Sequence, residues 1–119
     1  MTVDPSDLAR ELVRRRRVER DGNARRAEIL RSVVVGEAAA IIGDLGGRRA
    51  WLIGSLAWGN FGERSDVDIV FEGLALDRVG DVAARLADRL RVGGDVLRLE
   101  DLPPGFQDRV LAEGVALVA

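Results

Sequence analysis

The sequence predicts an α/β fold built on one small sheet, and three observations support this class. The chain has 119 residues, enough for one domain with one core. Short runs of apolar and β-branched residues alternate with longer segments of helical periodicity. Gly-Gly or Pro-Pro pairs separate several of these segments, at residues 46–47, 93–94 and 103–104. Strands that alternate with helices are typical of a sheet flanked by helices.

Helical periodicity covers most of the first 45 residues. Pro5 opens the first segment, residues 5–20, whose apolar stripe is sparse. The second segment, residues 24–45, carries apolar residues at i, i+4 spacing on two adjacent rows. The triplet between them, residues 21–23, is either a break or a weak point that costs about 1 kcal/mol within one long helix.

After the Gly-Gly pair at 46–47, short strands alternate with helices. The strands are indicated by brief runs of β-formers, and the helices by apolar faces with turn residues at their ends. The expected strands are residues 50–54, 66–73, 95–99 and 115–119. The expected helices are a single turn at 55–60, an amphipathic helix at 77–91 and a last helix from 103 to 114, with a loop at 61–65.

Two acids interrupt the second of these strands. Asp66 and Asp68 are two residues apart, so on a strand both carboxylates point to the same face. Val67, Ile69 and Phe71 point to the other face, where helices can bury them. Two carboxylates this close repel each other unless a cation lies between them. Oxygen ligands without His or Cys indicate Mg²⁺ or Mn²⁺.

A Gly-Ser turn ends the preceding strand. Gly54 lets a phosphate approach the backbone closely, and Ser55 offers a hydroxyl at the start of a short helix. We therefore expect the turn to hold nucleotide phosphates, while Asp66 and Asp68 hold the metal that bridges them. The alternative is a strand with two solvent-facing acids and an unrelated turn. The full pattern, with strands on both sides, favours the site.

The composition limits the chemistry that the chain can perform. It contains no His and no Cys, which excludes the commonest general base, the commonest zinc ligand and any disulfide. The polar, acidic start is not a secretory signal, and the longest apolar run is far shorter than a membrane span. We therefore expect a cytoplasmic protein with no membrane partner.

The stretch 54-GSLAWGNFGERSDVDIVF-71 resembles the signature of the polymerase-β-type nucleotidyltransferase superfamily, in which Gly-Ser, ten residues and Asp-x-Asp follow one another. Within this superfamily, residues 48–119 resemble the minimal nucleotidyltransferases. The resemblance implies a mixed sheet flanked by helices, with Mg²⁺ as cofactor and ATP or another nucleoside triphosphate as substrate. It also implies a helical HEPN-type toxin as partner. The chain would then be an antitoxin that transfers AMP from ATP to a tyrosine of that toxin.

The resemblance assigns roles to residues of this chain. Asp66 and Asp68 match the metal-binding pair, and Gly54 and Ser55 match the phosphate-binding turn. The family pattern also includes a third carboxylate on a later strand.

Asp95 is the candidate for this third carboxylate. It follows a Gly-Gly turn at the start of a predicted strand, which would bring it beside the acid pair. There it would complete a metal site for two ions and accept the proton of the attacking hydroxyl. The rival candidates, Glu100 and Asp101, fall at the far end of that strand.

One position departs from the family pattern. Related motifs often carry Arg four residues after the glycine, where this chain has Trp58. Arg64, just before the acid pair, is the candidate to bind phosphate in its place; a solvated side chain is the alternative. Trp58 is expected either to pack within the fold or to stack on the nucleobase.

The N-terminal region is rich in Arg. Residues 1–31 contain nine Arg and six acids, a net charge of +3, and they contain no aromatic residue. Because a nucleic-acid interface needs a stronger positive charge or stacking residues, direct nucleic-acid binding is not expected. A solvated helix face is one interpretation, and docking of a partner or of a second copy in a homodimer is the other. We divide the chain into an N-terminal helical extension, 1–23, and a nucleotidyltransferase domain, 24–119.

Two functions of different classes follow from the sequence. The first is a Mg²⁺-dependent nucleotidyltransferase that modifies a toxin protein. The second is a non-catalytic antitoxin that neutralises its partner by contact alone. The first function requires three working carboxylates and a nucleotide, whereas the second requires only an interface.

Overall fold

A computed structural model describes residues 4–58 and 66–118, and it contains a four-stranded mixed sheet. The strands are β1 (Arg49–Ile53), β2 (Asp68–Glu72), β3 (Val96–Arg98) and β4 (Val115–Ala116). Their order is β3-β2-β1-β4; β1 is antiparallel to both β2 and β4, whereas β2 and β3 are parallel. The predicted α/β class with one small mixed sheet is confirmed.

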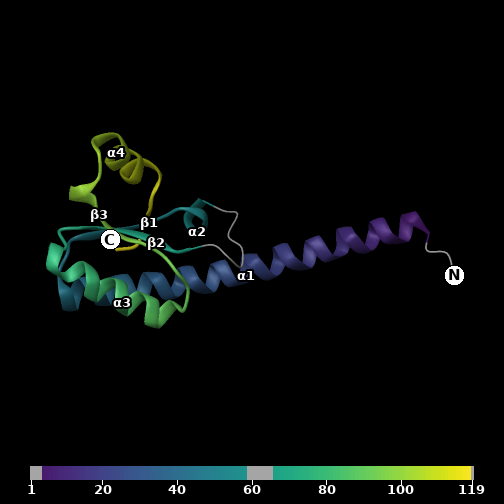
Figure 1. Cartoon of the computed structure of the whole chain (residues 1–119), viewed down its shortest axis with the longest axis horizontal. Coiled ribbons are helices and arrows are strands. Elements are labelled where there is room, and N and C mark those ends of the chain that lie inside the picture. The colour runs from purple at the N-terminus through teal and green to yellow at the C-terminus, as the bar shows by residue number, and fades with distance from the viewer. Residues whose placement is uncertain (1–3, 59–65, 119) are drawn as a thin grey trace.

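Helices cover both faces of this sheet. They are α1 (Pro5–Leu45), α2 (Ser55–Trp58), α3 (Val79–Leu90) and α4 (Pro104–Glu113). Helices α1 and α3 lie on one face of the sheet and α4 on the other (Figure 1). The helices and strands expected within the described residues are present, with ends that differ by a few residues. The loop expected at 61–65 lies outside the described residues.

Helix α1 is continuous for 41 residues. The Asp4 side chain caps its start by accepting the backbone N–H of Ser6, at 3.0 Å. The triplet 21–23 is therefore a weak point within one helix and not a break. The first buried residue of α1 is Ala27, and the part before it projects beyond the sheet (Figure 1). The division into an extension and a domain stays a prediction.

The sheet separates two apolar clusters, because successive strand residues point to opposite faces. Val67, Ile69 and Phe71 are buried in the larger cluster, against α1 and α3. Val70 points to the other face and packs in a smaller cluster with Val110 of α4. The alternation predicted for this strand is thus confirmed within β2, and it leaves Asp68 on the same face as Val70, the face on which α4 lies.

Polar contacts hold α1 against the rest of the fold. Arg85 of α3 pairs with Asp44 at 2.9 Å and with Glu37 at 3.4 Å, both on α1. The Arg31 side chain donates a hydrogen bond of 2.8 Å to the carbonyl oxygen of Leu56 in α2. Among the described helices, none combines the length and the apolar character that crossing a membrane requires.

Candidate active site

The Gly-Ser turn joins β1 to α2. Gly54 has φ +78°, a backbone conformation that side chains disfavour, and its carbonyl accepts the N–H groups of Ala57 and Trp58 at 3.1 and 3.0 Å. A Cβ atom at Gly54 would lie 3.2 Å from Oδ2 of Asp68. Glycine is therefore needed both for the turn and for the close approach of its backbone to an acidic side chain.

Asp68 lies at the centre of the site. One carboxylate oxygen faces Gly54, and the other, Oδ1, accepts the backbone N–H of Asp95 at 3.0 Å. Burial raises the pKa of the Asp68 carboxyl; the Asp95 N–H lowers it, and the negative charges of Asp95 and Asp66 raise it further. The net effect is a raised pKa, so the ionised carboxylate carries a cost that a nearby cation would offset.

Asp66 lies just before β2 and is exposed. The strand begins at Asp68, two residues later than the sequence predicts. The Asp66 Oδ1 atom would be 2.8 Å from a Cβ atom at Gly93, so this carboxylate lies against the glycine loop that follows α3. The N–H of Val67 donates to the carbonyl of Gly93 at 2.9 Å and fixes that loop beside the acid pair.

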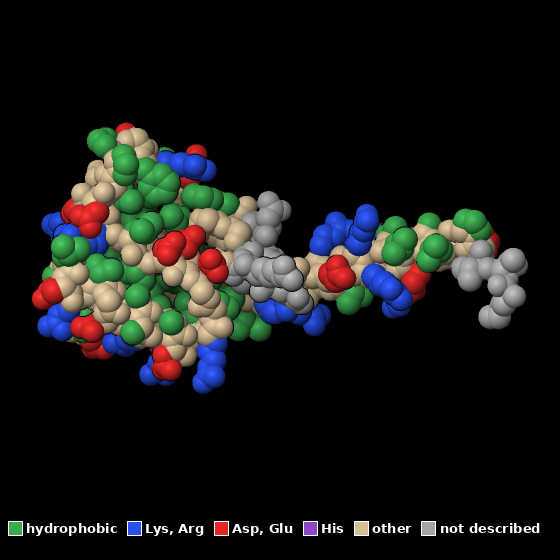
Figure 2. All heavy atoms as spheres, viewed as in Figure 1, with side chains coloured by type: hydrophobic (Ala, Val, Ile, Leu, Met, Phe, Trp, Pro, Cys, Tyr) green, Lys and Arg blue, Asp and Glu red, His purple; other side chains and the backbone are tan. Residues whose placement is uncertain are grey.

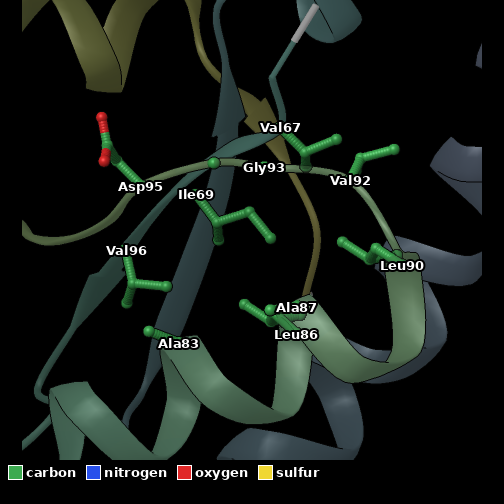
Figure 3. A pocket seen from close by; sticks show the side chains of 11 residues that line it. Val67, Ile69, Ala83, Leu86, Ala87, Leu90, Val92, Gly93, Asp95 and Val96 are labelled. Carbon is green, nitrogen blue, oxygen red and sulfur yellow. The ribbon is translucent and has the colours of Figure 1, made fainter.

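Asp95 is brought next to Asp68 by the start of β3. Its carbonyl accepts the N–H of Ile69 at 3.0 Å, while its own N–H bonds to Asp68. The Asp95 carboxylate is exposed and points away from the apolar side chains of Ile69 and Val96 (Figure 3). The structure thus brings the three predicted carboxylates to one region, although their catalytic roles stay predictions.

Glu100 and Asp101, the two rival candidates for the third carboxylate, make their contacts away from the acid pair. Glu100 accepts the backbone N–H of Gly73 at 2.5 Å, and Asp101 pairs with Arg98 at 3.1 Å. Both lie in a short 3-10 turn after β3, at the other end of the strand from Asp95. Of the three candidates, Asp95 is the one that contacts the acid pair.

A cavity of about 140 Å³ lies beneath the loop that carries Asp95. It lies between α3 and the segment 92–96 and is partly open to solvent (Figure 3). Its lining is mainly apolar and includes Val67, Ile69, Leu86, Leu90 and Val92. Asp95 borders this cavity, but its carboxylate points away from the apolar side chains (Figure 3).

The donor atoms of the acidic site suit Mg²⁺ in part. Within residues 4–58 and 66–118, no three carboxylates lie close enough to form a metal site by themselves. Asp66 and Asp68 nevertheless offer oxygen ligands beside a glycine turn, and Mg²⁺ is usually held by one or two carboxylates plus substrate phosphates and water. The pair therefore fits Mg²⁺ that arrives with a nucleotide, and Asp95 as a further ligand stays a prediction.

Trp58 connects α2 to α4. Its indole N–H donates a hydrogen bond of 2.7 Å to the carbonyl oxygen of Glu113, and the guanidinium of Arg109 lies 5.1 Å from the ring centroid. Arg109 also bonds to the Glu113 carboxylate at 2.9 Å. The packing role expected for Trp58 is thus observed, while base stacking stays untested. Arg64 lies outside the described residues.

Arg109 is the residue that sequence reasoning missed. No local pattern links it to Trp58, because α4 brings the two together from distant parts of the chain. An Arg three to four residues before a Glu on a helix predicts only an ordinary surface ion pair. Through its contact with Trp58, the Arg109 guanidinium lies near the end of α2, the helix that follows the Gly-Ser turn.

The fold and the acid pair beside a glycine turn define the chain as a nucleotidyltransferase-like α/β protein. The family model described as "Polymerase beta, Nucleotidyltransferase" matches residues 48–119, and the chain belongs to this family. None of the curated proteins is similar enough to count as a match.

Solved structures share the fold. A protein assigned as a minimal nucleotidyltransferase is 25% identical, with a TM-score of 0.66 over 75% of this chain and 93% of that one. A toxin–antitoxin structure with AMP-PNP is 21% identical, with a TM-score of 0.63 over 71% and 73%. The toxin–antitoxin MntA-HepT is 18% identical, with a TM-score of 0.57 over 74% and 72%.

Proposed function

We propose that this protein is an antitoxin that transfers AMP from ATP to a tyrosine of a HEPN-type toxin. Membership of the nucleotidyltransferase family supports the reaction class, and the fold shared with toxin–antitoxin structures supports the partner class. The observation that carries the proposal is the position of Asp68. It contacts both the glycine turn proposed to bind phosphates and the backbone of Asp95. A cytoplasmic setting is part of the proposal.

The nucleotide would bind at the glycine turn. Gly54 turns the chain beside the Asp68 carboxylate, and Ser55 begins α2 directly after it. Asp66 and Asp68 would hold Mg²⁺ against the phosphates. When bound, Mg²⁺ would offset phosphate charge and hold the attacking and leaving oxygens in line. The structure solved with AMP-PNP, an ATP analogue, supports a triphosphate as the ligand of this fold.

Asp95 would serve as the general base. The tyrosine oxygen attacks the α-phosphorus of ATP and forms a new P–O bond, while the bond to the β-phosphate oxygen breaks and pyrophosphate leaves. The phenolic proton passes to the Asp95 carboxylate, which is exposed and within reach of an incoming side chain. The chain contains no Tyr, so a tyrosine acceptor must belong to another protein.

A second candidate function is neutralisation of the toxin by contact alone. Trp58 occupies the position where related motifs often carry Arg, and it binds α4 instead of offering a cation. A protein that binds phosphate weakly at this site can still present the surface that neutralisation by contact requires. This candidate predicts a tight complex without transfer of label.

Nucleotide binding is the first test. ATP is titrated with and without Mg²⁺ while Trp fluorescence is followed, because Trp58 is 43% exposed and lies one helical turn after Gly54. We expect binding that needs Mg²⁺ and that is lost when Asp66→Ala and Asp68→Ala are combined. Asp88→Ala, at an exposed acid of α3, is the control for loss of charge. Equal binding by the double variant and wild type would reject the site.

Transfer is the second test. The protein is incubated with Mg²⁺, ATP labelled in its adenine or α-phosphate, and the helical protein encoded beside it. We expect label on a tyrosine of that partner. A tight complex with no label, under conditions where ATP binds, would favour the contact-only antitoxin.

A further inference from the structure

The projecting part of α1 is a single helix with apolar side chains in solvent. Hydrophobic side chains alternate with Arg side chains along it (Figure 2). Leu8 is 54% exposed and Leu12 is 48% exposed. Further along α1, Ile29 is 64% exposed and Val33 is 40% exposed, although that part of the helix packs on the sheet. An isolated helix gains most of its stability by burying such a face against something else.

These four residues share one face of α1. Leu8 and Ile29 are separated by 21 residues, as are Leu12 and Val33, and this interval equals three heptads. In a heptad labelled a to g, Leu8 and Ile29 occupy position d, and Leu12 and Val33 occupy position a. We call this a/d row the outer seam. A seam that keeps a strict heptad requires two helices to supercoil around each other.

The apolar residues of the outer seam are exposed, and the row that α1 buries is a different one. The buried residues of α1 are Ala27, Val34, Ala38 and Ile41, which fall at heptad positions b and f. At 100° per residue, the centre of that row lies about 100° around the helix from the centre of the outer seam. From Leu8 to Val33, every residue of the seam is exposed except Gly22, which is partly buried.

We propose that the outer seam binds the outer seam of a second copy of this chain, with the two α1 helices antiparallel. In the register that pairs apolar side chains with apolar side chains, the numbers of any two facing residues sum to 41. Leu8 then faces Val33 of the second copy, and Leu12 faces Ile29. Position a faces position d in every layer, as antiparallel helix pairs require. Leu8 and Leu12 of each chain thus cover Ile29 and Val33 of the other chain.

The polar middle of the seam favours this orientation by one layer, that of Glu19. Its a and d residues are Arg15, Glu19, Gly22 and Arg26. In the antiparallel register Glu19 faces Gly22, which has no atom near its Cβ position, and each Glu19 lies one layer from an Arg of both helices. The antiparallel register also places Arg15 opposite Arg26 in two layers, each next to a Glu19, whereas a parallel pair would bring identical charges together in three layers, Arg15, Glu19 and Arg26. Like charges at facing positions are a general means of rejecting an orientation.

The effect of salt on association distinguishes a second copy from a nucleic acid or an acidic protein as the partner. Residues 1–31 carry a net charge of +3, so two arms repel each other at long range. Screening by salt weakens that repulsion while apolar burial persists. Dimerisation should therefore strengthen as salt rises, whereas binding of nucleic acid or an acidic protein to the Arg side chains should weaken.

Engineered disulfides test the register. The natural chain has no Cys, so any disulfide reports the introduced positions alone. Full-length Leu12→Cys, Ile29→Cys and the double variant are oxidised and separated on a non-reducing gel. A bond between residues 12 and 29 of one chain is impossible, because they stand about 25 Å apart along a rigid helix. Val13→Cys with Ile29→Cys is the control one residue out of register.

The proposal expects covalent dimers from the Leu12→Cys, Ile29→Cys double variant and little from either single variant or the shifted control. Dimers from Leu12→Cys alone would indicate parallel helices and overturn the proposal. Equal cross-linking by all variants, or none by any, would also overturn it.

Light scattering on the uncross-linked protein tests whether the seam drives association. Val33 and Val35 are similarly exposed, at 40% and 45%, and only Val33 lies on the outer seam. We expect Val33→Asp to be monomeric at concentrations where wild type and Val35→Asp are dimeric. Raising NaCl from about 0.05 M to about 0.5 M should increase the dimer fraction of wild type. A monomeric wild type, equal effects of the two variants, or a dimer that salt dissociates would reject the antiparallel pair.

Discussion

The backbone N–H of Asp95 donates a hydrogen bond of 3.0 Å to Oδ1 of Asp68. This bond connects the start of β3 to the acid pair of β2, and the neighbouring carbonyl of Asp95 accepts the N–H of Ile69. Two bonds in opposite directions fix the backbone of Asp95 while its carboxylate remains free to contact a substrate. Because the donor is a backbone group, side-chain substitutions at Asp95 should leave this connection intact.

Asp95→Asn should abolish transfer and preserve the structure. Asn has the same shape but accepts no proton at neutral pH, and it removes one negative charge from the site. AMP transfer to the partner should fall by at least about 100-fold, the usual cost of losing a general base. Co-purification with the partner should be unchanged. Transfer at the wild-type rate would remove Asp95 from the proposed chemistry.

Asp68→Asn should stabilise the metal-free protein at neutral pH. Burial raises the pKa of Asp68, so the folded state disfavours the ionised carboxylate, and wild type loses stability as pH rises from the unfolded pKa through the folded pKa. Asn keeps an acceptor for the Asp95 N–H without the charge. In EDTA, thermal melts at pH 7 should give a higher Tm for the variant.

The same comparison has two internal checks. The Tm difference should shrink toward pH 4, near the unfolded aspartate pKa of about 3.9, because the wild-type carboxyl is then increasingly protonated in both states. Mg²⁺ at pH 7 should raise the Tm of wild type more than that of Asp68→Asn. A variant that is less stable than wild type at pH 7 in EDTA would show that Asp68 contributes stability as a carboxylate.

Gly94→Ala should disrupt the site through the backbone. An added Cβ atom would overlap the carbonyl oxygen of Val67, so the loop before Asp95 would have to move. We expect a loss of more than about 2 kcal/mol in the free energy of unfolding, measured by urea denaturation, together with weaker ATP binding. Gly80→Ala is the matched control: it lies in α3 with no atom nearby, and the change should be neutral or slightly stabilising. Equal stability of the two variants would contradict the close packing at Gly94.

Much of the site could be predicted because it depends on local patterns. The period-2 alternation of β2 places Asp68 on one face and Ile69 and Phe71 in the core, whatever the rest of the fold. The φ of +78° at Gly54 is likewise a property of a short turn between a strand and a helix. The parallel pairing of β2 and β3 then brings Asp95 to the same region, as the family resemblance implied.

The rest depends on contacts between distant residues. Nothing near Trp58 in the sequence indicates that Glu113 and Arg109 hold it. The sequence does not decide whether α1 continues through residues 21–23, because a glycine costs a helix only about 1 kcal/mol. The sequence also does not reveal that Ala27 is where α1 first becomes buried, since the apolar residues before it look equally suited to a core.

Deletion of residues 1–22 should separate association from chemistry. The buried residues of α1 begin at Ala27, so the shortened protein keeps its core, the Gly54 turn and the acid pair. ATP binding, followed by Trp fluorescence with Mg²⁺, should match wild type, and the Tm should change little. The deletion removes Leu8 and Leu12, half of the apolar residues of the outer seam, so light scattering should show a monomer. If the arm also contacts the toxin, association with the toxin should weaken as well. Unchanged sizes, alone and with the partner, would show that the arm does not serve association. Loss of ATP binding would instead assign the arm to the catalytic domain.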